Sequence, residues 1–129
     1  MILDTSALAA IFFGEPEAGL YTQLIHGGDR CLMSAANFVE LSILIESQIG
    51  RDAGRQYDAF FRRAGIAIEP VTVEQAHLAR QAFLDFGKGR HTAGLNFGDC
   101  FAYALAKITG EALLFKGEDF KKTDISSAL

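Results

Sequence analysis

The chain has 129 residues, of which 50% are hydrophobic and 22% are charged, and its 12 Lys and Arg against 16 Asp and Glu give a formal net charge of −4 at pH 7. This length suits a single globular domain spanning residues 1–129 and leaves too little chain for two separate domains. The acidic balance argues against a protein that holds nucleic acid over its whole surface, because such proteins carry a basic excess, so any contact with nucleic acid is expected to be local.

The expected elements follow one another along the chain as short apolar runs and amphipathic stretches, separated by glycines that mark element ends. Strands are expected at residues 1–3, 31–33, 66–71 and 112–115, with an edge strand near Ile125. Helices are expected at residues 7–13, 16–26, 35–48, 52–64, 73–86 and, after an N-cap at Asn96, up to residue 109. In the stretch 73–86, the helical period places Ala76, Ala79, Phe83 and Phe86 together on one side.

Strands that are continuously apolar and alternate with helices are typical of a parallel sheet that is covered on both faces. The sequence therefore predicts a three-layer α/β/α domain with a mainly parallel central sheet. Functional groups in such sheets gather beyond the carboxyl ends of the strands. Acidic residues at these positions are therefore the first candidates for a functional site.

The cellular setting can be inferred from the cysteines and the start of the chain. Cys31 and Cys100 are too few for a disulfide framework and lack a metal-ligand spacing such as C-x-x-C, which favours a reduced, cytoplasmic setting. The first residues do not resemble a signal peptide. The longest apolar runs fall well short of a membrane span, so no membrane partner is expected.

Two acids stand near the first and second strands. Asp4 follows the first strand directly and is either a helix N-cap or a functional acid. Glu40 has Ala36 and Asn37 on one side of it and Ile43 on the other along its helix face, so it is expected to face the core. A buried carboxylate needs a partner or a metal ion. The alternative is that this helix face turns far enough to reach water.

Two further acids follow in the second half of the chain. Asp99 lies three residues after Asn96, where the helix dipole favours an acid, and its helix is nearly all apolar, which places its first turn against the end of the sheet. Asp119 follows the strand 112–115 and is, taken alone, an ordinary loop acid.

In a doubly wound domain these four acids can converge on one pocket. Carboxylates in one place repel and raise each other's pKa values unless a cation joins them. An all-oxygen ligand set suits a hard cation, Mg²⁺ or Mn²⁺, rather than zinc. Acidic sites of this kind polarise a phosphate oxygen and activate a water for in-line displacement, which predicts phosphodiester hydrolysis.

Four ordered segments, which together cover essentially the whole chain, carry a resemblance to a known family. They are Ile2-Leu3-Asp4-Thr5-Ser6-Ala7-Leu8, Asn37-Phe38-Val39-Glu40, the run from Leu95 to Ala106, and the run from Leu113 to Phe120. In this set and order they resemble the PIN-domain ribonucleases, and within them the VapC-type toxins of type II toxin–antitoxin pairs. The resemblance implies a PIN-like fold and a Mg²⁺-dependent endoribonuclease with an RNA substrate, usually a homodimer, which a cognate VapB-type antitoxin neutralises.

The resemblance also implies roles for individual residues. Asp4, Glu40 and Asp99 match the family's acidic triad, with Asp4 and Asp99 as the direct metal ligands. Thr5 or Ser6 matches the hydroxyl position beside the first acid, a possible contact to substrate.

The chain departs from the family's pattern around the fourth acid. Relatives often have Thr-x-Asp where this chain has Phe115-Lys116-Gly117, which leaves Asp119 before Phe120 as the fourth acid. Glu118 is the alternative for that role.

Other features leave alternatives open. Lys88, Arg90 and His91, in the glycine-rich loop 87–94, either grip RNA phosphates or form an ordinary solvated loop, and His91 could also act as an acid or base. The apolar stretches 7–13 and 38–49 supply either a dimer or antitoxin surface or simply core.

Two other functions compete with the nuclease. One is a catalytically silent PIN-like module that binds RNA or protein. The other is a phosphoryl-transfer domain, which fits poorly because Asp4-Thr5-Ser6 lacks the second Asp of a D-x-D phosphatase signature and Pro70-Val71-Thr72 offers no phosphoacceptor Asp.

Overall fold

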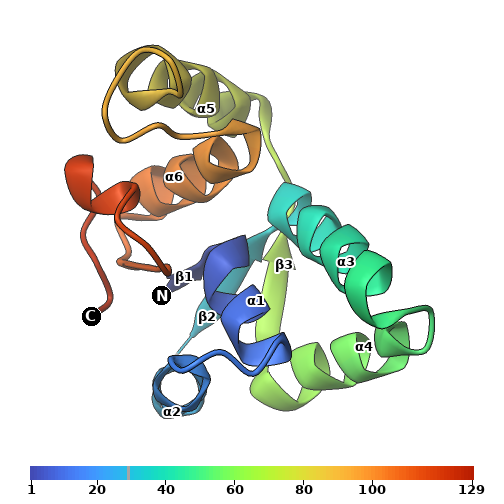
Figure 1. Cartoon of the computed structure of the whole chain (residues 1–129). Helices are drawn as coiled ribbons and strands as arrows, with labels where there is room; N and C mark the ends of the chain where they lie inside the picture. The colour runs from blue at the N-terminus through green and yellow to red at the C-terminus, as the bar shows by residue number, and fades with distance from the viewer. Residues whose placement is uncertain (29) are drawn as a thin grey trace.

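The computed structural model describes residues 1–28 and 30–129, and within them a four-stranded parallel sheet forms the centre, in the order β3-β2-β1-β4 (Figure 1). The strands are β1 (Ile2–Leu3), β2 (Cys31–Ser34), β3 (Ile66–Glu69) and β4 (Leu113–Leu114). The helices are α1 (Thr5–Phe12), α2 (Ala18–Gly27), α3 (Ala35–Ile49), α4 (Ala53–Ala64), α5 (Val73–Phe86) and α6 (Phe97–Thr109), with a short 3₁₀ helix η1 (Phe120–Lys122).

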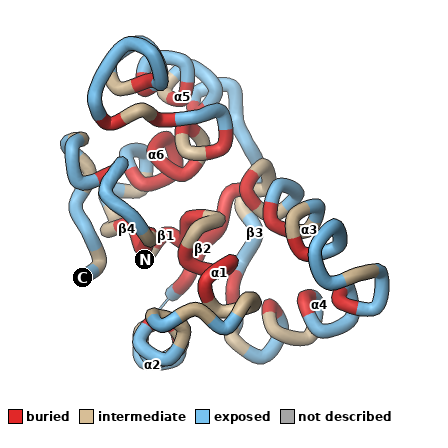
Figure 2. Tube along the Cα trace, viewed as in Figure 1, coloured by how far each residue is buried: buried red, intermediate tan, exposed pale blue. Residues whose placement is uncertain are grey.

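Helices cover both faces of this sheet, and the alternation of side chains along the strands divides the core between them. In β1, Ile2 packs in the cluster formed with α5 and α6, whereas Leu3 packs in the cluster formed with α1 to α4. Leu32 and Met33 in β2 divide in the same way. Figure 2 shows the buried residues concentrated along β1, β2, β4 and α6, whereas β3 is largely exposed. The predicted three-layer α/β/α architecture with a parallel sheet is confirmed.

The buried face of α5 differs from the one that its sequence predicts. Gln75, Ala79 and Ala82 are buried, whereas Ala76 and Phe83 are exposed. The physical reason is that α5 packs chiefly against α6 and presents small side chains there, so the larger apolar residues are left at the edge of the contact. The edge strand expected near Ile125 does not form among the described residues, where Ser127 makes an isolated bridge to Leu113 instead.

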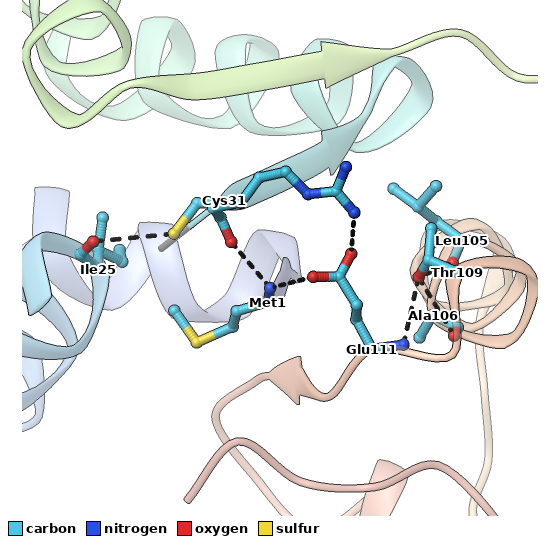
Figure 3. A network of polar contacts seen from close by, with 8 residues as sticks. Met1, Ile25, Cys31, Leu105, Ala106, Thr109 and Glu111 are labelled. Carbon is cyan, nitrogen blue, oxygen red and sulfur yellow. Dashed lines mark hydrogen bonds and ion pairs between the residues drawn. The ribbon is translucent and has the colours of Figure 1, made fainter. Parts of the chain in front are cut away.

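The edge of the sheet where the strands begin is held by ionic contacts (Figure 3). The amino group of Met1 donates to Glu111 Oε1 at 2.9 Å and to the carbonyl of Arg30 at 2.8 Å. Arg30 Nη2 donates to the other Glu111 oxygen at 2.8 Å. These two cations hold the pKa of Glu111 below its usual value, the bond from the amino group most strongly. The ion pairs therefore fix the start of β1. The candidate acids lie at the other end of the sheet, where the strands end.

Cys31 and Cys100 are both free and buried. Within the part of the chain that the structure describes, no helix has both the length and the apolar character needed to cross a membrane.

Candidate active site

Asp4 lies where β1 ends and α1 begins, and it is only 2% exposed. Its Oδ2 accepts hydrogen bonds from the backbone N–H of Ser6 at 3.0 Å and from the Ser6 hydroxyl at 2.5 Å, so its N-cap role is confirmed. Its other oxygen, Oδ1, is buried and has no hydrogen-bond partner among the residues that the structure describes. Burial raises the pKa of Asp4, and the charge of Glu40 adds to this effect. One carboxylate oxygen of Asp4 is thus bonded to Ser6, and the other makes no hydrogen bond to a described residue.

The two hydroxyls that follow Asp4 each contact an acid of the site. Ser6 Oγ, which donates to Asp4, also accepts from the backbone N–H of Lys116 at 2.9 Å and so joins α1 to the segment after β4. Thr5 Oγ1 donates to Glu40 Oε1 at 2.5 Å. In this structure both hydroxyls therefore orient carboxylates.

Glu40 is exposed, so the prediction that it faces the core is wrong. The reason is the rotation of α3, which turns Asn37, Leu41 and Ile45 toward the core at a spacing of four residues. Glu40 precedes Leu41 by one position, which rotates its side chain by about 100° onto the flank of the helix. There its carboxylate reaches the first turn of α6 and accepts from Thr5 and, at 3.4 Å, from Asn37 Nδ2.

Asp99 is held in a reciprocal capping arrangement at the start of α6. Its backbone N–H donates to Asn96 Oδ1 at 2.9 Å, and its Oδ2 accepts from the Asn96 backbone N–H at 3.0 Å. Partial burial raises the pKa of Asp99 to about 7, and the charges of Asp4, Asp119 and Glu40 add to this shift. The predicted position of Asp99 in the first turn of its helix is confirmed. The negative charges of all three other candidate acids act on its carboxyl group.

Three of the four predicted acids line one cavity of about 410 Å³. They are Asp4 at the cap of α1, Glu40 in α3 and Asp99 in α6. The lining of the cavity comprises Asp4, Thr5, Ser6, Ala9, Glu40, Ile43, Leu44, Ser47, Asn96 and Asp99. Asp119 is exposed just before η1 and acts on Asp99 through its charge. Glu118, its alternative, is exposed and paired with Lys121 at 2.9 Å. Neither Glu118 nor Asp119 is among the described residues that line the cavity.

The predicted cationic loop lies apart from the acids. The turn after α5 exposes Lys88, Arg90 and His91. None of the three is among the described residues that line the cavity. Arg90 stands over the ring of Phe83 at 5.8 Å, and His91 Nδ1 accepts from a backbone N–H at 3.0 Å. Any contact of these side chains with RNA would thus lie outside the acidic cavity.

A hard divalent cation such as Mg²⁺ requires oxygen ligands. Among the described residues, no three His, Cys, Asp or Glu side chains form a ready-made metal cluster. Mg²⁺, however, commonly takes only one or two carboxylates and completes its shell with water and phosphate oxygens. Asp4 offers a buried oxygen without a partner, and its charge raises the pKa of Asp99. The pair therefore fits a hard divalent cation.

Sequence reasoning did not single out Asn37, which is fully buried and donates to both the Gly98 carbonyl, at 2.9 Å, and Glu40. The available signal was an amide three residues before the acid, with apolar residues on both sides of it.

Comparison with known proteins places this chain in a family. Residues 1–126 match the family model described as the PIN domain. The chain is 48% identical over 127 residues to a ribonuclease VapC of Mycolicibacterium smegmatis, covering 98% of each, and 46% identical over 127 residues to ribonuclease VapC30 of Mycobacterium tuberculosis, covering 98% of this chain and 97% of that one. The crystal structure of Mycobacterium tuberculosis VapC20, a toxin described as cleaving the sarcin-ricin loop, matches with a TM-score of 0.79 at 20% identity, over 98% of this chain and 97% of that chain. The chain belongs to the PIN-domain family and, within it, to the VapC-type ribonuclease toxins.

Proposed function

We propose that this protein is the endoribonuclease toxin of a toxin–antitoxin pair, acting in the cytoplasm, and that it hydrolyses RNA phosphodiester bonds with the help of Mg²⁺, for which Mn²⁺ can substitute. The observation that carries the proposal is the cavity in which Asp4, Glu40 and Asp99 meet, with one buried oxygen of Asp4 unpartnered. The full-length similarity to proteins named ribonuclease VapC supports the reaction class.

Each acid has a role in this proposal that follows from its contacts. Asp4 and Asp99 would hold the cation, with Asp4 fixed by Ser6 and Asp99 by Asn96. When bound, such a cation polarises a phosphate oxygen and lowers the pKa of a water molecule. Glu40, held by Thr5, would orient the attacking water and accept its proton.

Asp119, with Glu118 as the alternative, would be the fourth acid of the site. Lys88, Arg90 and His91 would contact RNA beyond the cavity, where fixed cations position phosphates without reading sequence. The expected products carry a 5′-phosphate and a 3′-hydroxyl.

The same proposal includes protein partners, a VapB-type antitoxin and a second copy of the chain. A toxin–antitoxin complex from Klebsiella pneumoniae shares the fold, with a TM-score of 0.69 at 16% identity, over 95% of this chain and 92% of that chain. On this chain, α3 exposes Val39, Ile43 and Ile49, at 52%, 61% and 52%. Large apolar side chains grouped on one helix support a protein-binding surface.

The direct test is incubation of total cellular RNA with the purified protein, followed by mapping of the new RNA ends. Cleavage is expected with Mg²⁺, is expected to stop in excess chelator, and is expected to return when Mg²⁺ or Mn²⁺ is added back. Undiminished cleavage in chelator would contradict the metal requirement. RNA that is retained by the protein but never cut would instead favour the catalytically silent module.

A further inference from the structure

Gly98 occupies a position where the helix itself does not need a glycine. It is the second residue of α6, and its backbone has the ordinary helical conformation rather than a positive φ. A Cβ built at this position, however, would stand where the carboxyl group of Glu40 lies, in collision with both of its oxygens. The missing side chain therefore makes room for Glu40.

Two donors hold the Glu40 carboxylate in that space. Thr5 Oγ1 donates to Oε1 at 2.5 Å from α1, and Asn37 Nδ2 lies 3.4 Å from the same oxygen. The same Asn37 amide donates to the Gly98 carbonyl at 2.9 Å and so joins α3 to the first turn of α6. Residues of three helices thus define one position for this side chain.

We propose that Gly98 is a positioning residue for Glu40, an inference that rests on the proposed ribonuclease function. Glu40 is exposed and has a long side chain with many rotamers, so the helix alone does not fix its carboxylate. A methyl group at position 98 would push the carboxylate out of the space beside Asp99 and away from Thr5. Because the displaced group is the end of a flexible side chain, the fold would tolerate the change.

The test is Gly98→Ala, made in the wild-type chain and in a Glu40→Ala chain. Gly54→Ala is the matched control, since Gly54 is also the second residue of its helix, α4, and a Cβ there meets nothing within 4 Å. Displacement of a catalytic group by about 1 Å costs on the order of 100-fold in rate. Gly98→Ala is expected to lower kcat by about this factor with KM for RNA unchanged, whereas Gly54→Ala leaves both constants unchanged.

The Glu40→Ala background separates positioning from damage to the helix. There the space is empty, so adding Gly98→Ala is expected to change the residual rate by no more than about twofold, because coupled positions are not additive. Full kcat in Gly98→Ala, or the same loss in both backgrounds, would overturn the proposal.

Thermal unfolding in chelator gives a readout that does not depend on catalysis. Gly98→Ala is expected to raise Tm more in the Glu40→Ala chain than in the wild-type chain, because a helical alanine stabilises only where it displaces nothing. Equal shifts in the two backgrounds would overturn the proposal. If the wild-type protein cuts no RNA, the proposed function fails, and the Tm comparison still reports on the contact.

Discussion

Replacing Asp99 by Asn is expected to lower the rate of RNA cleavage at saturating RNA by at least about 100-fold. Loss of groups that merely support metal ligands costs about 10- to 100-fold in affinity or activity, and a ligand itself should cost no less. Asn has the shape of Asp, and its amide oxygen can still accept the backbone N–H of Asn96, so the start of α6 is preserved. The measurement is the cleavage rate of labelled RNA in Mg²⁺. The control is Asp58→Asn, which changes the same charge on the exposed surface of α4.

The same variant is expected to be more stable than the wild type when no divalent cation is present. Burial and the neighbouring acids raise the pKa of Asp99 to about 7, well above the usual value of 3.8 for an Asp side chain. The folded chain thus binds this proton more tightly than the unfolded chain, and the resulting stability is fully present below about pH 4 and is lost as the pH rises through about 7. Urea unfolding in chelator at alkaline pH should show a higher midpoint for Asp99→Asn, with the difference disappearing in acid. Unchanged cleavage, or a lower midpoint at alkaline pH, would contradict this assignment.

Asp4→Asn is expected to lower the rate of RNA cleavage by a factor similar to that of Asp99→Asn, while the chain stays folded. Asn is as good an N-cap as Asp, so it can still accept the Ser6 N–H that begins α1. What it removes is the negative charge at the buried oxygen that has no protein partner. Cleavage of labelled RNA and urea unfolding, measured on the same preparations, separate these two effects.

Asp4→Ala separates the N-cap role of this residue from its role in cleavage. It should cleave no better than Asp4→Asn, and it should lose about 1 kcal/mol more of the free energy of unfolding, the usual contribution of an N-cap side chain. If Asp4→Asn cleaves RNA at the wild-type rate, Asp4 takes no part in the reaction. If the two variants have equal free energies of unfolding, the Asp4 side chain does not stabilise the start of α1.

The parts of this molecule that the sequence predicts well depend on short-range signals. The helix after Asn96 begins as expected because the reciprocal cap lies within four residues, and it ends at Gly110, whose φ of 71° suits a residue without a side chain. The alternation of apolar strands with helices predicts the parallel sheet, since few other architectures bury such strands on both faces. The position of Asp4 at the end of β1 follows from the same pattern.

The remaining features depend on contacts between elements that are distant in the sequence. Glu40 faces the first turn of α6 rather than the core because one residue along a helix changes direction by about 100°, and only the packing of α3 fixes that rotation. The room that Gly98 leaves for the Glu40 carboxylate is visible only once α3 and α6 are brought together. A backbone hydrogen bond from Lys88 to Leu95 closes the loop 87–94, and its Lys88 and Arg90 are not among the described residues that line the cavity.

We propose that Asp4 and Asp99 together bind a divalent cation, and Mn²⁺ binding followed by electron paramagnetic resonance tests this. Wild-type protein is expected to remove free Mn²⁺ from solution in a saturable manner, Asp58→Asn to bind it equally well, and the double variant Asp4→Asn/Asp99→Asn to bind none at this site. Mn²⁺ binding by the double variant with the wild-type affinity and stoichiometry would contradict the claim.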